Sequence, residues 1–218
     1  DNIKEYLEAD MRQVNDAETL GESALKQGVK MLIAHIAAND PVLVVVDSDC
    51  DGFTSSALLI NYLYDLFPSF VKNHLSWYLH SGKQHGLSDC LDETKNYKLV
   101  ILPDSSSNDY AEHLTLREIG IDVLVLDHHE ADHISTDAIV INNQLSDYPN
   151  KGMSGVGVTY QFCRYMDKMQ KTNFADDYLD LVALGNQGDM MPITSVETKV
   201  LIFEGFKRKN IKNPFIYN

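Results

Sequence analysis

The sequence contains no apolar run that approaches the roughly 18–20 residues needed to span a bilayer, and its N-terminus is too polar and acidic for a signal peptide. It has only three cysteines, Cys50, Cys90 and Cys163, and no two of them form a Cys-x-x-Cys pair, which argues against a zinc ribbon. Because scattered free thiols are typical of a reducing compartment, we expect a cytoplasmic protein with no membrane partner. The chain begins with Asp1 rather than Met, which indicates either processing or a piece of a longer protein.

Positive charge is scarce, since 18 lysines and arginines stand against 32 aspartates and glutamates, and the formal net charge is −14. A surface that coats a long stretch of nucleic acid needs many cationic contacts to phosphate, so this composition argues against an extended nucleic-acid footprint. A site built from carboxylates is itself acidic, however, and bound metal ions return positive charge to it. The composition therefore leaves a metal-dependent nuclease open.

Short apolar runs alternate with helical patterns along the 218 residues. Residues 42–46 read Val-Leu-Val-Val-Val, which is typical of a strand buried on both faces. Further strands are predicted at residues 75–79, 98–103, 123–126 and 138–141, and helices at residues 3–38, 54–67, 111–119, 156–169, 176–184 and 196–209. This alternation predicts an α/β fold, with a mostly parallel β-sheet flanked by helices and further helices at both ends of the chain.

Three of the predicted strands are followed by an aspartate, namely Asp47, Asp104 and Asp127. Ligands of an open parallel sheet bind outside the carboxyl ends of its strands, so the fold would carry these carboxylates to one edge. Residues 47–52 read Asp-Ser-Asp-Cys-Asp-Gly, and three carboxylates at alternate positions favour hard divalent cations. A calcium EF-hand loop is excluded because Leu58 stands where that loop requires Glu, which leaves a solvated acidic turn as the alternative.

The other polar clusters are less specific when each is taken alone. Asp104 precedes three serines that could instead cap the next helix. The run Asp127-His128-His129 places two imidazoles beside a carboxylate, a set that suits both a metal ion and a phosphate. Asp189 lies in a Gly-flanked loop where the backbone can approach a ligand, or where a helix ends.

In this order, the four motifs resemble those of the DHH phosphoesterase superfamily. The first motif, Val-Asp-Ser-Asp-Cys-Asp-Gly-Phe-Thr-Ser, is similar to the RecJ-type exonucleases, whereas the branch that cleaves short oligonucleotides tends toward Pro-Asp-x-Asp-x-x-Gly-Ser. Residues 154–158 (Ser-Gly-Val-Gly-Val) and 180–185 (Asp-Leu-Val-Ala-Leu-Gly) also resemble RecJ segments. The residue pattern predicts an N-terminal helical segment (1–38), and the resemblance implies a DHH phosphoesterase domain (39–195) followed by a C-terminal helix (196–218). Either this helix leads to a second domain absent from this chain, or the protein is a minimal version of the family.

The resemblance also implies a site for two Mn²⁺ or Mg²⁺ ions. The implied metal ligands are Asp49, Asp51, Asp104, His128 and Asp189, with Asp104 as the bridge between the ions. The implied catalytic residues are Asp47, Asp127 and His129. In this scheme Asp47 is a ligand or a nearby base, Asp127 orients His128, and His129 faces the scissile phosphate.

Four further residues are implied to contact the substrate. Gly155 and Gly157 would allow the substrate backbone to approach closely. The family carries an arginine that meets a terminal phosphate before its Gly-Leu-Ser segment, but the corresponding stretch here is shortened to residues 80–88. Lys83 or His80 would take the place of that arginine.

The activity that the resemblance implies is 5′-3′ exonucleolytic hydrolysis of single-stranded DNA by a two-metal mechanism, with a role in DNA repair or recombination. Hydrolysis of short oligonucleotides or cyclic dinucleotides is the alternative within the same chemistry. A non-catalytic binding module should have lost ligand residues, whereas every expected position is filled here. Inorganic pyrophosphatase activity is a more remote alternative, because the first motif does not match that branch well.

Overall fold

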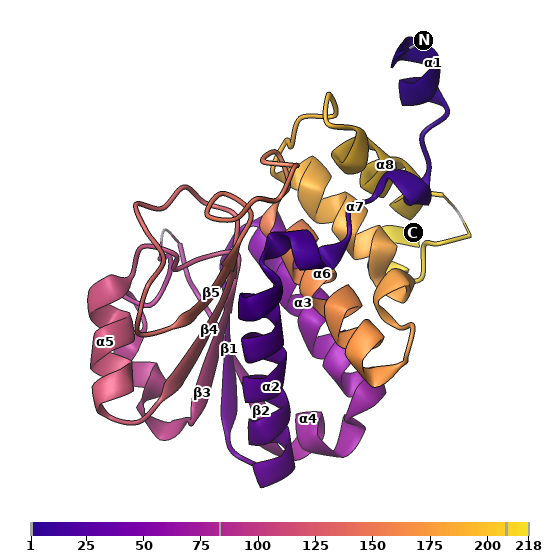
Figure 1. Cartoon of the computed structure of the whole chain (residues 1–218). Coiled ribbons are helices and arrows are strands. Elements are labelled where there is room, and N and C mark those ends of the chain that lie inside the picture. Colours follow the sequence, from indigo (N-terminus) through magenta and orange to yellow (C-terminus); the bar gives the residue numbers. More distant parts are fainter. Residues whose placement is uncertain (1, 83, 208, 218) are drawn as a thin grey trace.

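The computed structural model describes residues 2–82, 84–207 and 209–217, and a five-stranded sheet lies at its centre. The strands are β1 (Val42–Val46), β2 (Leu75–Leu79), β3 (Leu99–Pro103), β4 (Asp122–Asp127) and β5 (Ile139–Asn142). They lie in the order β2-β1-β3-β4-β5, and each of the four pairings is parallel (Figure 1). The α/β prediction is therefore confirmed, and each predicted strand is found to within one residue at either end.

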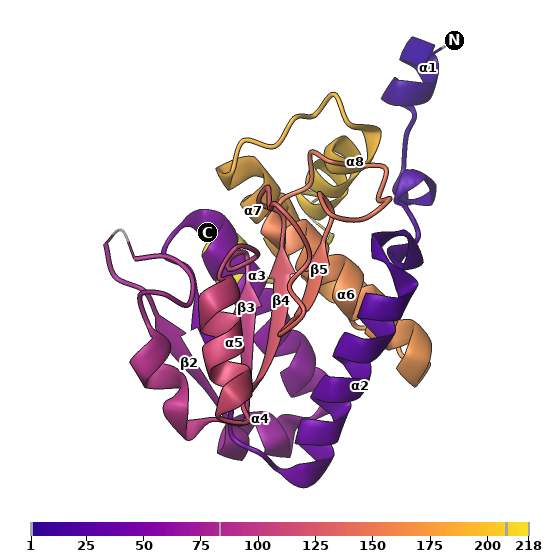
Figure 2. The same ribbon diagram turned by 60° about the vertical axis from the view of Figure 1, so that its left-hand side comes forward.

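Helices cover both faces of the sheet (Figures 1 and 2). One face carries α2 (Glu22–Ala38), α3 (Cys50–Leu66) and α6 (Gly155–Gln170), with α7 (Leu179–Gly188) and α8 (Val196–Gly205) packed outside them. The opposite face carries α5 (Tyr110–Glu118). The remaining helical elements are α1 (Asn2–Leu7), η1 (Met11–Gln13), η2 (Ala17–Leu20), α4 (Pro68–His74), η3 (Leu91–Asn96), η4 (Ala175–Tyr178) and α9 (Pro214–Tyr217). None of the helices in the described ranges is long and apolar enough to cross a membrane.

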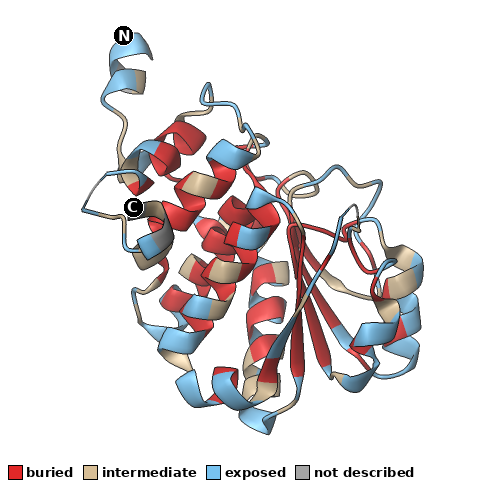
Figure 3. Cartoon of the chain, turned by 180° about the vertical axis from the view of Figure 1, so that it is seen from behind, coloured by how far each residue is buried: buried red, intermediate tan, exposed pale blue. Residues whose placement is uncertain are grey.

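The central strands are buried on both faces because their residues alternate between two apolar clusters (Figure 3). On β1, for example, Val44 points to the cluster shared with α2, α3 and α6, whereas Val45 points to the cluster beneath α5. This explains why the strands read as continuous apolar runs rather than as alternating polar and apolar positions.

The order of the strands creates a switch point at the carboxyl end of the sheet. The chain passes from β1 to β2 on one side and then returns to β3 on the other side of β1. Loops that leave β1 and β3 therefore diverge at the edge where ligands of open parallel sheets bind. Asp47 and Asp104 directly follow these two strands and lie at this edge.

The prediction of one helix over residues 3–38 is wrong, because the structure divides this stretch into α1, η1, η2 and α2. Asp10 caps η1 through the backbone N–H of Arg12, and Gly21 adopts a left-handed φ of 110° before α2 begins. The intervening chain buries Val14, Ala17 and Leu20 against the main core instead of continuing a helix.

The predicted last helix, residues 196–209, is also too long, since α8 ends at Gly205. A Cβ at Gly205 would lie 2.0 Å from the carbonyl oxygen of Leu179, so this glycine allows α8 to pack tightly on α7 before it ends. The division of the chain at residues 38 and 195 stays a prediction. In the structure, α2 shares the main core, and a Cβ at Gly28 would lie 3.1 Å from Leu124 and 3.3 Å from Ile141.

Candidate metal and phosphate site

The three aspartates of the loop after β1 have three different surroundings. Asp49 is the N-cap of α3 and accepts a hydrogen bond from the backbone N–H of Gly52 at 2.8 Å. This cap starts α3 one turn earlier than the predicted residue 54. The carboxylate of Asp51 accepts hydrogen bonds from the backbone N–H groups of Gly155 at 2.6 Å and Val156 at 3.0 Å. Burial raises the pKa of Asp51, and the hydrogen bonds from the positive end of α6 only partly offset this effect.

Asp47, the third of these aspartates, bonds a histidine. Its Oδ2 lies 2.7 Å from Nδ1 of His85, and its Oδ1 accepts a hydrogen bond from the backbone N–H of Ser48 at 2.9 Å. Burial acts to raise the pKa of Asp47, but the hydrogen bond and charge of His85 outweigh burial and hold the pKa below its usual value. Asp47 is thus ionised at neutral pH.

Asp104 occupies the centre of the site. Its side chain is 1% exposed, its backbone adopts a φ of 67°, and its Oδ1 accepts no hydrogen bond from a described residue. A Cβ at Gly155 would lie 2.3 Å from that oxygen, so only glycine fits beside this carboxylate. Burial, followed by the charge of Asp51, raises the pKa of Asp104 well above its usual value. A cation would relieve both effects.

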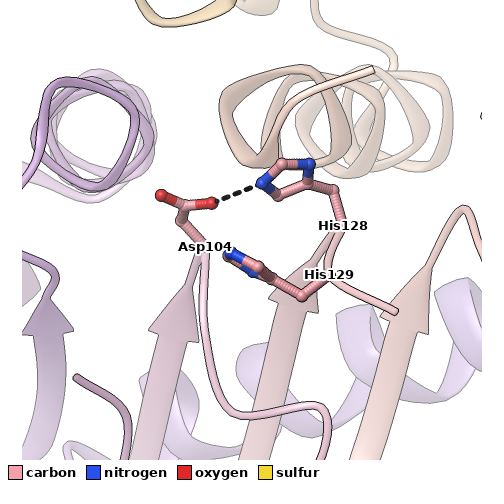
Figure 4. A group of neighbouring side chains, drawn as sticks. All are labelled: Asp104, His128 and His129. Carbon is pink, nitrogen blue, oxygen red and sulfur yellow. Dashed lines mark ion pairs between the residues drawn. The ribbon is translucent and has the colours of Figure 1, made fainter. Parts of the chain in front are cut away.

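The histidines that follow β4 point toward these carboxylates. Figure 4 shows the rings of His128 and His129 beside Asp104. The Nε2 atom of His128 lies 3.2 Å from Asp104 Oδ1, 3.8 Å from Asp51 Oδ2 and 3.6 Å from Asp189 Oδ2. Atoms that share a small ion at about 2.1 Å lie about 3 Å apart when their bonds are perpendicular, so these spacings suit a set of ligands.

Asp127 orients a different histidine from the one predicted. Its Oδ1 lies 2.7 Å from Nδ1 of His129, whereas His128 contacts this carboxylate through its backbone N–H. Burial acts to raise the pKa of Asp127, but the bonds from His129 and from Ser107 outweigh it, and the pKa lies far below its usual value. The same bond to Asp127 raises the pKa of His129.

The prediction that Asp189 lies in a Gly-flanked loop is wrong, because α7 continues through Gly188. Asp189 directly follows this helix, which agrees with the alternative that a helix ends here. The glycines allow α7 to approach α3: a Cβ at Gly185 would lie 2.3 Å from Thr54 Oγ1, and one at Gly188 would lie 2.6 Å from Cys50 Sγ. Burial raises the pKa of Asp189. Its Oδ2 is buried and accepts no hydrogen bond from the described part of the chain.

Three groups of side chains in this site have ligand atoms within 4.8 Å of one another. The groups are Asp104 with His128 and His129, Asp51 with His128 and Asp189, and Asp47 with Asp49 and Asp104. Asp104 and His128 each belong to two groups, so the groups form one continuous site. Its carboxylate oxygens and imidazole nitrogens fit a divalent ion such as Mn²⁺ or Mg²⁺. Asp104 Oδ1 and Asp189 Oδ2 accept no hydrogen bond from a described residue and lie near Nε2 of His128, which is further evidence that the residues fit a cation.

Of the four residues predicted to contact the substrate, three are buried and one lies outside the described residues. Gly155 and Gly157 are buried, and a Cβ at these positions would meet Asp104 and Met153 respectively. The tight packing of both glycines is thus against the protein itself, and a contact with substrate stays a prediction. His80 is 3% exposed, and neither of its ring nitrogens has a hydrogen-bond partner among the described residues. Lys83 lies outside the described residues.

A family model described as "DHH family, N-terminal domain" matches residues 41–186, which is more than half of the chain and includes Asp47, Asp104 and the histidines after β4. The chain belongs to the DHH family. The resemblance inferred from the motifs is therefore confirmed.

Several curated relatives match this DHH domain. The chain is 39% identical over 187 residues to YorK of the SPbeta prophage of Bacillus subtilis (strain 168), which is provisionally named a single-strand DNA-specific exonuclease. It is 29% identical over 203 residues to the single-stranded-DNA-specific exonuclease RecJ of Escherichia coli (strain K12). Both alignments cover 85% of this chain, but only 31% of YorK and 35% of RecJ. The chain thus spans about a third of the length of these relatives.

Solved structures show the same fold. A crystal structure of exonuclease RecJ bound to manganese matches with a TM-score of 0.73 and 22% identity, over 84% of this chain and 47% of that one. RecJ of Thermus thermophilus in complex with Mn²⁺ matches with a TM-score of 0.70 and 22% identity, over 84% of this chain and 26% of that one. The five-stranded parallel sheet with its helices is therefore the fold of the RecJ DHH domain.

His85 is a residue of this DHH domain that the sequence motifs missed. It lies between β2 and η3, bonds Asp47, and packs edge-to-face on the ring of His129 with the centroids 5.4 Å apart. Its hydrogen bond to Asp47 raises the pKa of His85. The only signal in the sequence is that a histidine lies in the shortened stretch 80–88, where a basic residue was expected.

Proposed function

We propose that this chain carries the catalytic domain of a divalent-metal-dependent nuclease that hydrolyses single-stranded DNA from the 5′ end. One observation carries the proposal: Asp104 is buried, accepts no hydrogen bond on Oδ1 from a described residue, and is shared by two of the three ligand groups. The names of YorK and RecJ support single-stranded DNA as the substrate class, and the RecJ-like form of the first motif supports the direction of cleavage.

The six candidate ligands divide between two ions. Asp51, His128 and Asp189 would hold one ion, Asp47 and Asp49 would hold the other, and Asp104 would bridge them. When bound, such a pair supplies positive charge to the attacking and leaving oxygens of an in-line displacement at phosphorus. The RecJ structures in complex with manganese support Mn²⁺ as one of the ions that this set of residues accepts.

The other residues of the site would bind and orient the substrate. Asp127 fixes Nδ1 of His129, which leaves Nε2 of this ring for an oxygen of the scissile phosphate. Asp47 would accept a proton close to the reacting phosphate if it does not bind an ion. His80 is buried near Asp47, and its ring nitrogens bond no described residue, so it is the candidate for the terminal phosphate, with Lys83 as the second candidate. Gly155 and Gly157 would border the path of the strand.

The test is Mn²⁺-dependent digestion of single-stranded DNA, labelled either at the 5′ or at the 3′ end. The 5′ label should appear first as a mononucleotide, whereas the 3′ label should appear in progressively shorter strands. Asp49→Asn should reduce the rate at least about a hundredfold, because it removes a ligand charge while an amide oxygen can still cap α3. The matched control is Asp65→Asn at the far end of α3, which should leave the rate unchanged.

The same assay separates the alternatives. Turnover of a dinucleotide or a cyclic dinucleotide without degradation of a long strand would favour these short substrates over single-stranded DNA. Failure to cleave any of these substrates, together with tight Mn²⁺ binding, would favour a different phosphodiester substrate or a requirement for a further domain. Failure to bind Mn²⁺ would favour a non-catalytic binding module. Equal activity of Asp49→Asn and the unmodified chain would contradict the proposed ligand set.

A further inference from the structure

Asp47 differs from the other two aspartates of the first loop, because neither of its oxygens accepts a hydrogen bond from a helix N-terminus in the described part of the chain. Asp49 caps α3, and Asp51 accepts hydrogen bonds from the first two N–H groups of α6, so the backbone fixes both of these carboxylates. Among the described residues, Asp47 Oδ1 bonds only the N–H of Ser48, and Oδ2 lies 2.7 Å from Nδ1 of His85. Its direction therefore depends on a side chain from another loop.

The loop that carries His85 is itself firmly held. The backbone N–H of His85 donates to Asp89 at 2.9 Å, and the N–H of Leu87 donates to Asp109 at 2.8 Å. Gly86 adopts a φ of 66°, and a Cβ there would lie 2.5 Å from Asp109 Oδ2. Because Asp109 belongs to the segment that follows Asp104, the loop after β2 is attached to the loop after β3 while His85 reaches the loop after β1.

The hydrogen bond between His85 and Asp47 runs in one direction only. An ionised carboxylate accepts and cannot donate, so Nδ1 of His85 carries the proton whether the ring is neutral or charged. The pair Asp127–His129 has the same arrangement, and the two rings contact each other edge-to-face. Two strand-end aspartates are thus each joined to one histidine at the mouth of the site.

We propose that His85 is a positioning residue that holds the carboxylate of Asp47 toward Asp49 and Asp104, and thereby sets the affinity of this ligand group for a divalent ion. The inference rests on the metal binding in the proposed function and needs no assumption about the substrate. The inference assigns a role to the shortened stretch of residues 80–88, which supplies a hydrogen bond from outside the motifs to the candidate metal ligand Asp47. Residues that orient metal ligands in this way typically change metal affinity by about 10–100-fold when they are replaced.

Two amide variants separate the hydrogen bond from the size of the ring. The side-chain nitrogen of His85→Asn can occupy the place of Nδ1, whereas that of His85→Gln reaches toward the place of Nε2. We expect His85→Gln to bind Mn²⁺ about tenfold or more weakly, and His85→Asn to stay within about threefold of the unmodified chain. Affinity is measured from the electron paramagnetic resonance signal of free Mn²⁺, and melting temperatures report whether each variant folds. His74→Asn, at the amino end of β2, is the control and should bind Mn²⁺ normally.

A double-mutant cycle tests whether His85 acts through Asp47. In an Asp47→Ala background, His85→Gln should cause no further loss of Mn²⁺ affinity, because the carboxylate that it orients is gone. Additive losses would overturn the inference, and so would equal losses for His85→Asn and His85→Gln, which would make the ring itself a ligand or a packing element. Normal Mn²⁺ binding by His85→Gln would overturn it while leaving the proposed function intact. A folded, unmodified chain that binds no Mn²⁺ would contradict both.

Discussion

At the scale of single residues, the site depends on the absence of a side chain at Gly155. A Cβ there would lie 2.3 Å from Asp104 Oδ1, so Gly155→Ala should displace this carboxylate and weaken Mn²⁺ binding by about tenfold or more. Gly120→Ala is the control, since a Cβ at Gly120 has no neighbour within 4 Å. In this variant the left-handed φ of 77° strains the backbone, but no side chain is displaced. That variant should lose about 1 kcal/mol of unfolding free energy and bind Mn²⁺ normally. Calorimetric titration with both variants checks this, and equal binding would exclude steric placement of Asp104.

Residue types, spacing and the family resemblance indicated the candidate ligands, but not the partner of each side chain. The sequence indicated Asp104 by its place after a strand and His128 by the paired imidazoles beside a carboxylate, and the resemblance implied a ligand role for both and for Asp189. It could not show that Asp127 bonds the ring of His129 rather than that of His128, because adjacent residues differ only in the direction of their side chains. His85 was missed because its contact with Asp47 depends on a turn at Gly86 that no spacing rule describes.

At the scale of elements, α2 supports the sheet although it precedes the matched family region. Leu32 on this helix is fully buried in the main core, so Leu32→Ala should lower the free energy of unfolding by about 2–5 kcal/mol. Lys30→Ala on the exposed side of the same helix should change it by less than about 0.5 kcal/mol. Urea unfolding of the two variants measures the difference. A small effect of Leu32→Ala would indicate that residues 1–38 form a separate segment, as the sequence suggested.

Strands were easier to predict than helix ends because a strand buried on both faces leaves an unbroken apolar run. Residues 42–46 are such a run, and β1 has the predicted bounds. Helix ends depend on packing and caps instead. Gly185 and Gly188 resemble a turn in the sequence, yet both are helical, and they allow α7 to pack against α3, which leaves no room for side chains there. Likewise Gly21 breaks the predicted first helix by its backbone conformation.

At the scale of the whole molecule, the acidic site should make stability depend on divalent ions. Saturating Mn²⁺ at a hundred times its Kd adds about 2.7 kcal/mol, or about 5–10 °C in Tm for a chain of this size. Burial and the charge of Asp51 raise the pKa of Asp104, so its ionised form destabilises the metal-free fold. Asp104→Asn should therefore melt higher than the unmodified chain in EDTA and lose most of the Mn²⁺ shift. Scanning calorimetry measures both, and a lower Tm in EDTA would contradict the expected repulsion.

The candidate metal ligands come from four separate stretches of the chain: Asp51 on α3, Asp104 after β3, His128 after β4 and Asp189 after α7. An ion held by all four would act as a reversible cross-link that closes three long loops at once, and closing long loops removes conformational entropy from the unfolded chain. Local opening of α7 or of the strand ends would then require release of the ion. Amide hydrogens in these distant segments would exchange with solvent together, as one cooperative unit, when the ion is bound.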